Sequence, residues 1–433
     1  MLAKSVKVLL AGAALALLGG CSTPCDLNGA GRLCAPISSN TSAPPLPVKP
    51  PPAPPPEPEP EPQTFAVESP AGAPAADAPA PDAAPTAEPA ANGQPPVRIG
   101  LLLPLRSDAL GAAAESLRAG FMAAYERDRD GFAVTVIETG DAPQDVLAIY
   151  AKAQEEQDIL VGPLARSAVT AVAASPLVRK PTIALNYPEG RGSANESPMP
   201  GNMLSMGLSL EDEARQVAGW AAAEQPHAYA LVLSAGPAWQ RRISSAFNAQ
   251  WQRLGLSSQS VEMSAVNGYL SDAELVQLRA RVQADPPALI FAAMDADQAR
   301  QLRVALGNGV PVYGTSSLNP GLARTAYGPE MDGVRLLDLP WQVQRDHPAV
   351  MVYPQLLPKG ERKPTADMER LYALGIDAFR VAREVALHPG ARFNMDGVTG
   401  RLAVGFGQGA ASFERTEQQA VYQDGVLQPV ALP

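Results

Sequence analysis

Apolar residues beyond residue 96 alternate between short continuous runs and stretches with helical spacing. The first run covers 97–105 without interruption, which is typical of a strand buried on both faces of a parallel sheet. In the stretch that follows, 109–129, Leu117 and Phe121 lie about one helical turn apart. The pattern therefore predicts a buried strand followed by an amphipathic helix.

This alternation continues in two successive series, one ending near residue 185 and one running from about 210 to 313. Repeated strand–helix alternation predicts an α/β fold with a doubly wound parallel sheet in each of two lobes. A long helix is expected over 366–387. The other expected helices cover 143–156, 165–174, 210–224, 239–254, 272–284 and 296–306, and the other expected strands cover 132–137, 158–161, 181–185, 229–233, 260–263, 288–292, 310–313, 399–404 and 418–423.

The two series divide the folded domain, 97–433, into two lobes. We expect the first lobe to comprise about 97–208 and 340–390, and the second about 209–339 and 391–433. Ligands of parallel sheets bind outside the carboxyl ends of the strands, so the expected binding site is a cleft between the lobes. The candidate cleft residues lie in the loops at these ends: Ser107, Gly162, Leu164, Asn186, Tyr187, Ser234, Asp295 and Ser316.

A receptor for an amino acid would use such residues directly. Hydroxyl and backbone N–H groups near Ser107, Leu164 and Asn186 would hold the carboxylate, and Asp295 would hold the amine. Residues of these types are common in any loop between a strand and a helix, and Asp295 also suits the cap of the helix that follows it. The identity of any small-molecule ligand therefore stays open.

The first residues have the composition of a bacterial export signal. Lys4 and Lys7 precede an apolar or small stretch over 8–18, which is shorter than the roughly 20 residues that a membrane span needs. Small residues then precede Cys21, as in a lipoprotein signal. We expect residues 1–20 to be the signal peptide and Cys21 to carry the lipid. An ordinary signal peptide followed by an incidental Cys is the alternative.

Residues 21–40 would then form the lipidated N-terminus, held on the membrane by acyl chains. Ser22 rather than Asp follows the modified Cys, which favours the outer membrane over the inner one. Cys25 and Cys34 lie nine residues apart in an exported chain, so a local disulfide is predicted. Two thiols without a nearby His or a further Cys fall short of a zinc site.

Residues 41–96 hold 20 of the 45 Pro residues and seven acids against one Lys. Such a segment cannot bury enough apolar surface to fold, and it favours the extended polyproline conformation. At about 3.1 Å per residue it could reach on the order of 170 Å. We expect a disordered acidic tether that holds the folded domain away from the membrane. A passive linker with no required length is the alternative.

Composition and motifs exclude several functions. The chain carries 34 Lys+Arg and 44 Asp+Glu, a net charge of −10, which argues against a nucleic-acid partner. His227, His347 and His388 lie far apart in the sequence, and the motifs of zinc hydrolases, serine hydrolases and phosphate-binding loops are absent from it. We therefore expect no enzymatic activity, no cofactor and no metal.

One predicted helix carries a candidate protein contact. Trp239 and Trp251 lie 12 residues apart on it, with Arg242 between them. Trp and Arg are enriched where proteins bind one another. The alternative is that both Trp side chains pack on the sheet of the second lobe.

Five short segments carry a family resemblance: Val161-Gly-Pro-Leu164, Ala184-Leu-Asn186, Leu339-Pro-Trp341, 370–379 and Asp396-Gly-Val-Thr-Gly-Arg-Leu402. In this order they resemble the C-terminal domain of the LpoA/LppC lipoprotein family. The segments 99–105, 119–124 and 159–164 resemble the wider superfamily of type I periplasmic binding proteins. The resemblance spans about 97–425 and implies a two-lobed domain with a cleft.

The resemblance also implies a function. Lipoproteins of this family are anchored in the outer membrane and activate a class A penicillin-binding protein, so we expect an allosteric activator of peptidoglycan synthesis. Better-known members carry a helical-repeat domain ahead of this one, and here the Pro-rich tether takes its place. A lipid-anchored solute-binding protein for an amino acid or small peptide, serving an ABC-type transporter, is the alternative, although an outer-membrane anchor suits an inner-membrane transporter poorly.

Overall fold

The computed structural model describes residues 95–191, 198–321, 328–356, 363–407 and 409–430. The signal peptide and the lipidated N-terminus predicted above, with Cys21, Cys25 and Cys34, lie outside the described residues, as does nearly all of the tether. The described residues therefore belong almost entirely to the folded domain.

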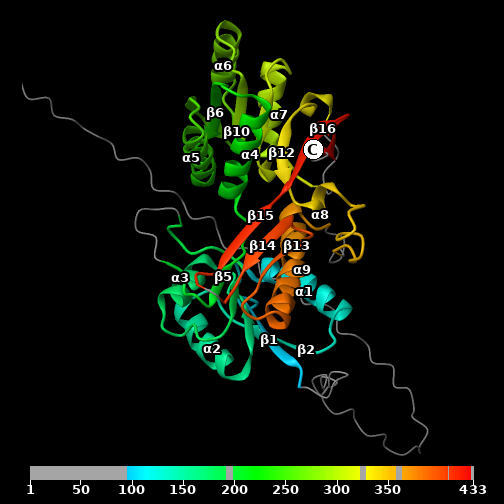
Figure 1. Ribbon diagram of the computed structural model, residues 1–433. Helices are drawn as coiled ribbons and strands as arrows, with labels where there is room; N and C mark the ends of the chain where they lie inside the picture. The colour runs from blue at the N-terminus through cyan, green and yellow to red at the C-terminus, as the bar shows by residue number, and fades with distance from the viewer. Residues whose placement is uncertain (1–94, 192–197, 322–327, 357–362, 408, 431–433) are drawn as a thin grey trace, which may run out of the picture. The chain divides into compact units, whose positions relative to one another are not determined.

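A five-stranded parallel sheet forms the first lobe, which lies in the lower half of Figure 1. Its short strands are rich in Ile, Leu and Val, as expected for strands covered on both faces. In spatial order the strands are β2 (Phe132–Glu138), β1 (Val97–Leu103), β3 (Ile159–Val161), β4 (Thr182–Ala184) and β5 (Met203–Ser205).

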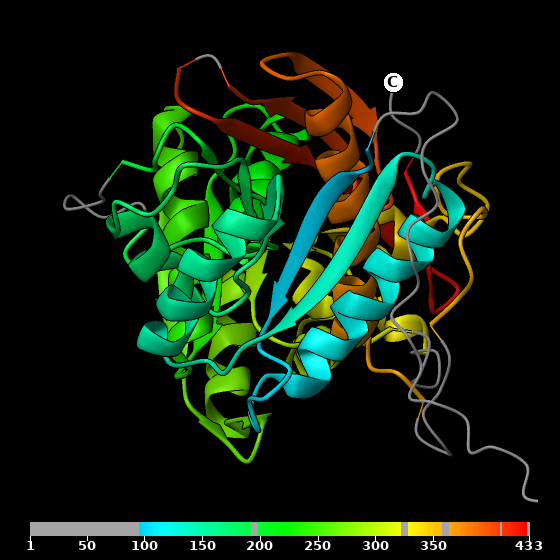
Figure 2. The same cartoon turned by 90° about the horizontal axis from the view of Figure 1, so that it is seen from below.

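Helices cover both faces of this sheet because successive side chains of β1 point to opposite sides. Ile99 and Leu101 pack with α1 (Gly111–Arg127) and α9 (Ala366–Leu387), which Figure 2 shows in cyan and orange beside the strands. Leu102 instead packs with α2 (Pro143–Glu156) and α3 (Arg166–Ala174). The first lobe is therefore doubly wound.

A seven-stranded sheet forms the second lobe. Its five parallel strands extend at one edge into an antiparallel pair near the end of the chain. In spatial order the strands are β17 (Val426–Pro429), β16 (Gln418–Gln423), β12 (Arg335–Asp338), β11 (Val312–Gly314), β10 (Leu289–Ala293), β6 (Ala230–Ala235) and β7 (Ser258–Met263).

The second sheet is covered in the same manner. Leu231 and Leu233 of β6 pack in a core with α6 (Asp272–Ala284) and α7 (Ala296–Leu306). Val232, between them, packs in the opposite core with α4 (Leu210–Glu224) and α5 (Ala238–Arg253). The expected doubly wound α/β fold in two lobes is confirmed for the described residues.

Three antiparallel strands form a further sheet, which the pattern of apolar residues predicted only in part. These are β13 (Arg392–Asp396), β14 (Arg401–Gly405) and β15 (Ser412–Thr416). Leu402, Val404 and Phe406 lie in the core of the first lobe. Assigning all of 391–433 to the second lobe was therefore wrong, because its first part packs on the first lobe and only β16 and β17 join the second sheet.

The remaining elements are short helices and strands in the connecting segments, including the strand pair β8 (Ala265–Val266) and β9 (Tyr269–Leu270). A two-residue turn with positive φ at Asn267 and Gly268 links two of these strands, which is the hairpin geometry that suits twisted strands. None of the described helices combines the length and the apolar character needed to cross a membrane. The other short elements are α8 (Pro340–Val343), η1 (Ser316–Leu318) and η2 (Pro329–Met331).

Two glycines allow α1 and α9 to approach closely. A Cβ atom on Gly120 would lie 1.9 Å from the carbonyl oxygen of Tyr372, and one on Gly375 would lie 2.1 Å from that of Leu117. Neither backbone oxygen can move without displacing its helix. The contact between these helices, which covers one face of the first sheet, therefore requires Gly at both positions.

Gly375→Ala tests this packing. We expect the free energy of unfolding to fall by about 3 kcal/mol, because the added methyl group overpacks the contact between the helices. Gly219→Ala is the matched control, since Gly219 is also helical but exposed, and a Cβ atom added to it would have no neighbouring atom within 4 Å. Chemical denaturation should show the control unchanged or stabilised by up to about 1 kcal/mol. Equal effects of the two substitutions would contradict the close approach of α1 and α9.

Candidate functional site

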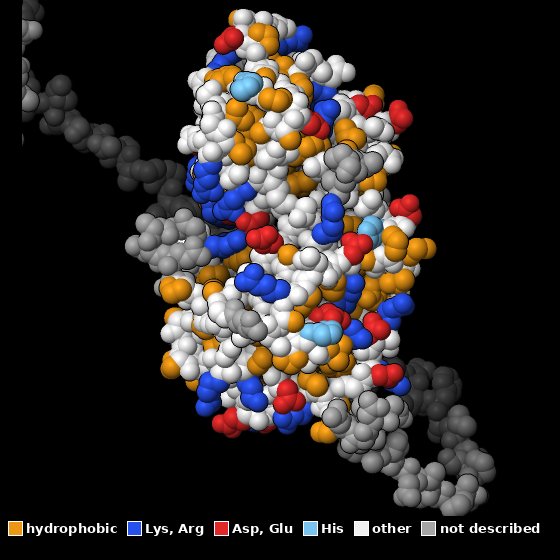
Figure 3. Space-filling model, in the orientation of Figure 1, with side chains coloured by type: hydrophobic (Ala, Val, Ile, Leu, Met, Phe, Trp, Pro, Cys, Tyr) orange, Lys and Arg blue, Asp and Glu red, His pale blue; other side chains and the backbone are white. Residues whose placement is uncertain are grey.

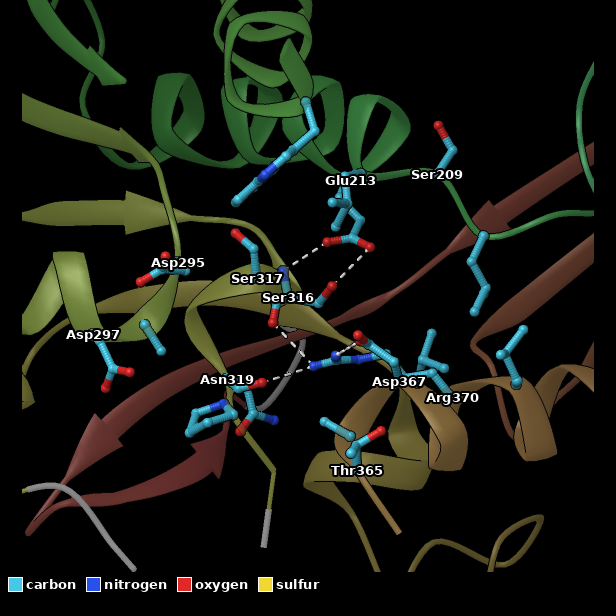
Figure 4. A pocket seen from close by; sticks show the side chains of 18 residues that line it. Ser209, Glu213, Asp295, Asp297, Ser316, Ser317, Asn319, Thr365, Asp367 and Arg370 are labelled. Atoms are coloured by element: carbon cyan, nitrogen blue, oxygen red, sulfur yellow. Dashed lines mark hydrogen bonds and ion pairs between the residues drawn. The ribbon is translucent and has the colours of Figure 1, made fainter. Parts of the chain in front are cut away.

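A cavity of about 640 Å³ lies where the lobes meet, shown in Figure 4. Four helices begin at its wall: α4, α5 and α7 of the second lobe and α9 of the first. Side chains that cap three of these helices also line the cavity, among them Thr365, which accepts a hydrogen bond from the Met368 N–H at the start of α9. Ser209 accepts a hydrogen bond from the Asp212 N–H at the start of α4, and Asp295 forms a capping box with Gln298 at the start of α7. The predicted cap at Asp295 is thus confirmed.

A buried ion pair crosses from one lobe to the other at this cavity. Arg370 of α9 donates from Nη2 to Oδ2 of Asp338 at 2.8 Å and from Nε to Oδ1 at 3.1 Å. Nη2 also donates to the backbone oxygens of Ser316 and Asn319, both at 3.0 Å. Asp338 ends β12 and is fully buried. The guanidinium therefore joins the first lobe to three points of the second.

Glu213 lies beside this pair and is 3% exposed. Its carboxylate accepts hydrogen bonds from the backbone N–H of Ser316 at 2.7 Å and from the Ser316 hydroxyl at 3.0 Å (Figure 4). Burial raises the pKa of Glu213 to about 8; the Ser316 N–H opposes this shift and the Asp338 carboxylate adds to it. The site thus places two acids close together beside one buried guanidinium.

A second arginine ties the strand β15 to the first lobe. Arg415 donates to the backbone oxygens of Gly207 at 2.7 Å and Met206 at 3.0 Å, and to the Thr399 hydroxyl at 3.1 Å. Asp377, at the centre of α9, accepts hydrogen bonds from the backbone N–H and the hydroxyl of Thr399 at 2.8 and 2.7 Å. In Figure 3 basic and acidic side chains gather where β15 passes between the lobes.

The structure brings only two of the eight candidate cleft residues, Asp295 and Ser316, to the large cavity. Tyr187 instead lines a neighbouring cavity of about 480 Å³. The prediction that all eight line one cleft was therefore wrong for Tyr187 and for five others. Those five are Ser107, Gly162, Leu164, Asn186 and Ser234, none of which lines the large cavity.

Local contacts explain why these loop residues stay out of the cavity. The Ser107 hydroxyl donates to Asp141 at 2.7 Å. The Asn186 side chain donates to the backbone oxygen of Leu164 at 3.0 Å and accepts from the Tyr187 N–H at 2.9 Å. Their polar groups stabilise the loops in which they lie rather than facing a ligand.

The three residues predicted as a protein contact on α5 do not lie on one surface. Trp251 is fully buried, stacks on Phe247 with ring centroids 5.3 Å apart, and donates to the backbone oxygen of Ser257. Its prediction as a protein contact was wrong, because 12 residues turn a helix about 120° beyond whole turns and place it on a different face from Trp239. Trp239 is half-buried at the wall of the cavity, and Arg242 is exposed and ion-paired with Glu211 at 2.9 Å.

Sequence patterns did not reveal the charged residues that matter most here: Glu213, Asp338, Arg370 and Glu417. One signal was present, since Asp338 ends an apolar run directly before Leu339 and a proline. No group of three or more His, Cys, Asp or Glu side chains among the described residues is placed to hold a metal ion.

Comparison with known proteins assigns the chain to a family. Residues 90–425 match the family model described as "LppC putative lipoprotein". The chain belongs to the LppC lipoprotein family. Curated relatives named penicillin-binding protein activator LpoA include one from Aliivibrio fischeri, 26% identical over 71% of this chain and 54% of its own length, and one from Mannheimia succiniciproducens, 27% identical over 77% and 55%. This LppC-family chain spans about half the length of these relatives.

Two solved structures share the fold of this LppC-family domain. One, described as the "LpoA (YraM) C-domain from Haemophilus influenzae, a regulator of PBP1A", is 25% identical, has a TM-score of 0.60, and covers 77% of this chain and 100% of its own. The other, from Chromobacterium violaceum, is described as a "putative branched-chain amino acid ABC transporter". It is 34% identical with a TM-score of 0.60 and covers 75% of this chain and 100% of its own.

Arg370→Met tests the ion pair between the lobes. The substitution keeps the length of the side chain but leaves the Asp338 carboxylate buried without its counter-charge. We expect the free energy of unfolding to fall by about 3–5 kcal/mol in a urea titration near neutral pH. Lys152→Met is the control: this side chain is 77% exposed, its nearest acid is 3.9 Å away, and a change below about 0.5 kcal/mol is expected. An Arg370→Met protein as stable as the control would contradict the role of the pair.

Proposed function

We propose that this chain is an outer-membrane lipoprotein that binds a class A penicillin-binding protein and activates its peptidoglycan synthesis. The lipid on Cys21 anchors the chain, and the Pro-rich tether carries the two-lobed domain towards the synthase. The domain acts allosterically, by binding one conformation of the synthase better than another and so shifting its population. It contributes no catalytic residue of its own.

Membership of the LppC family is the observation that carries this proposal. Curated relatives over this region are named penicillin-binding protein activators, and the Haemophilus domain of the same fold is described as a regulator of PBP1A. The described region corresponds to that domain alone. We propose that the two-lobed domain makes the contact with the synthase.

The polar groups of the large cavity support a protein partner over a solute. Asp295, the expected partner of a ligand amine, accepts the hydrogen bond that caps α7. The N–H and hydroxyl of Ser316, the other candidate cleft residue at this cavity, donate to Glu213. Because both Ser316 donors are already used within the chain, a ligand carboxylate that bound to them would have to break existing hydrogen bonds.

A receptor for an amino acid is the second candidate. The structure from Chromobacterium violaceum, which is described as a transporter of branched-chain amino acids, favours it. Such a receptor needs lobes that close on the solute. The ion pair of Arg370 with Asp338 and the hydrogen bonds of Arg370 to Ser316 and Asn319 already join the lobes beside the cavity.

Direct binding separates the two candidates. The full mature chain, with Cys21→Ser to keep it in solution, is immobilised, and the periplasmic part of a class A penicillin-binding protein from the same organism is the analyte for interferometry. A panel of amino acids is added as competitors. We expect saturable binding that the panel leaves unchanged, and a rise in glycan and cross-link synthesis when the chain is added. Absence of binding, with one amino acid raising the unfolding temperature, would establish the receptor instead.

Trp239→Ala tests whether the mouth of the cavity belongs to the docking surface. We expect affinity for the synthase to fall by at least about tenfold, because buried Trp side chains dominate the binding energy of many interfaces. Arg253→Ala is the control, since Arg253 is exposed at the other end of α5. Interferometry measures both, after circular dichroism shows that both variants fold. Equal affinity of the two variants would place the docking surface elsewhere.

A further inference from the structure

Three buried acids mark the three places where the chain crosses between the lobes. Glu213 lies in the first turn of α4, just after the first crossover, and Asp338 ends β12 at the second. Glu417 is the single residue between β15 of the first lobe and β16 of the second. All three are at least nine-tenths buried. Each of the three connections between the lobes, which must bend if the lobes move, therefore has a buried carboxyl group in it or beside it.

The buried charges at the crossovers do not balance. Glu417 precedes Gln418, which lies opposite Asp338 in the pairing of β12 with β16, and its N–H donates to Gln216, one helical turn after Glu213 on α4. Arg370 pairs with Asp338, and Arg415 lies two residues before Glu417. With every group ionised, three negative charges face two positive ones, and an uncompensated buried charge is costly. One acid of the cluster must therefore hold a proton for the crossovers to remain buried as described.

Glu417 is the acid placed to hold that proton. It is 5% exposed, and its Oε2 atom has no hydrogen-bond partner in the described structure. Glu213, by contrast, receives two hydrogen bonds from Ser316. Cavities of about 480 and 290 Å³ reach Glu417 from either side, so protons can exchange with solvent.

The other charged groups near the cluster are few and largely paired. Arg215 pairs with Asp212 on α4, and His347 lies 3.4 Å from Asp396. Asp367 of α9 also pairs with Arg370, at 2.9 Å. The charged groups that face the cluster or line the cavities beside it are Asp212, Glu213 and Arg215 of α4, Asp338 of β12, Asp367 and Arg370 of α9, Asp396 of β13, Arg401 of β14, Glu414 and Arg415 of β15, and Arg191 and His347 of the connecting segments.

We propose that the three crossovers form a proton-operated latch. With one proton on Glu417, the cluster is neutral and the lobes hold the described arrangement. Loss of that proton adds a buried negative charge between α4 and β12, and the lobes change their relative angle to let water reach it. The latch controls the shape of the domain whatever binds to it, so it goes beyond the proposed function.

The pKa values of Glu417 and Glu213 are both raised, which supports a proton held within the cluster; the hydrogen bonds of Ser316 to Glu213 are what favour Glu417 as its place. Burial raises the pKa of Glu417 well above its usual value, and the neighbouring Glu213 adds to the shift. Burial likewise raises the pKa of Glu213 to about 8 from 4.5. An acid whose pKa is higher in the folded chain than in the unfolded chain stabilises the folded state. This stabilisation is complete at pH values below the pKa of the unfolded chain, and it is lost as the pH rises through the pKa of the folded chain. The described arrangement of the lobes, with Glu417 protonated, is therefore expected at pH values below the raised pKa.

Pulsed electron paramagnetic resonance on the full chain tests the latch. Spin labels are attached to Lys152→Cys on α2 and Gln277→Cys on α6, two exposed sites in different lobes, after Cys21, Cys25 and Cys34 are changed to Ser. The distance between the labels is measured from about pH 5 to about pH 9. We expect one transition of a few ångström as pH rises.

Glu417→Gln should abolish that transition and keep the acidic distance throughout, because an amide imitates the protonated acid but cannot ionise. Glu414→Gln, which removes an exposed acid from β15, is the matched control and should retain the transition. Glu213→Gln leaves two acids with two arginines and should move the transition to lower pH. A constant distance in the unsubstituted protein, or a transition that survives Glu417→Gln, would overturn the proposal. If a variant fails to fold, the pH dependence of the distance in the unsubstituted protein still tests whether the lobes move.

Discussion

The guanidinium of Arg370 lies where the first lobe meets the second, and the arrangement of the domain depends on the bonds it makes. It pairs with the buried carboxylate of Asp338 and donates to the backbone oxygens of Ser316 and Asn319. These partners belong to β12 and to the segment after β11, whereas Arg370 belongs to α9. An arginine can serve several acceptors at once because its donors form a planar fork.

This constraint explains why the cavity is an unpromising solute site despite its position. Its wall combines apolar side chains such as Leu210, Trp239 and Leu371 with helix starts and a few polar side chains, which is the composition that a receptor would use. Much of that polarity is used within the chain. Glu213 and Asp295 form hydrogen bonds inside the second lobe, to Ser316 and to the start of α7, and Arg370 pairs with Asp338 across the lobes. The same fold can thus serve as a receptor or as a docking module, and the allocation of its hydrogen bonds decides which.

Burying acids at the crossovers costs free energy, and a simple connection between the lobes would not need them. Glu417 lies between two strands that belong to different lobes, and its Oε2 atom is buried without a hydrogen-bond partner in the described structure. Replacing such a cluster by apolar residues often stabilises a protein, so its presence is weak evidence for stability. A role in the relative position of the lobes accounts for it better.

The sequence by itself determined the two series of strands and helices, since amphipathic spacing and continuous apolar runs are local properties of the chain. It also predicted the cap at Asp295, which depends on residues three apart. It could not place β13 and β15 on the first lobe, nor separate Trp239 from Trp251, nor find the charged cluster at the crossovers. Arg370 and Asp338 are 32 residues apart, and Arg415 and Met206 are 209 apart. Only the tertiary structure brings such pairs together. A charged residue can be identified as buried only once the partner that neutralises it is known, and its neighbours in the chain do not show that partner.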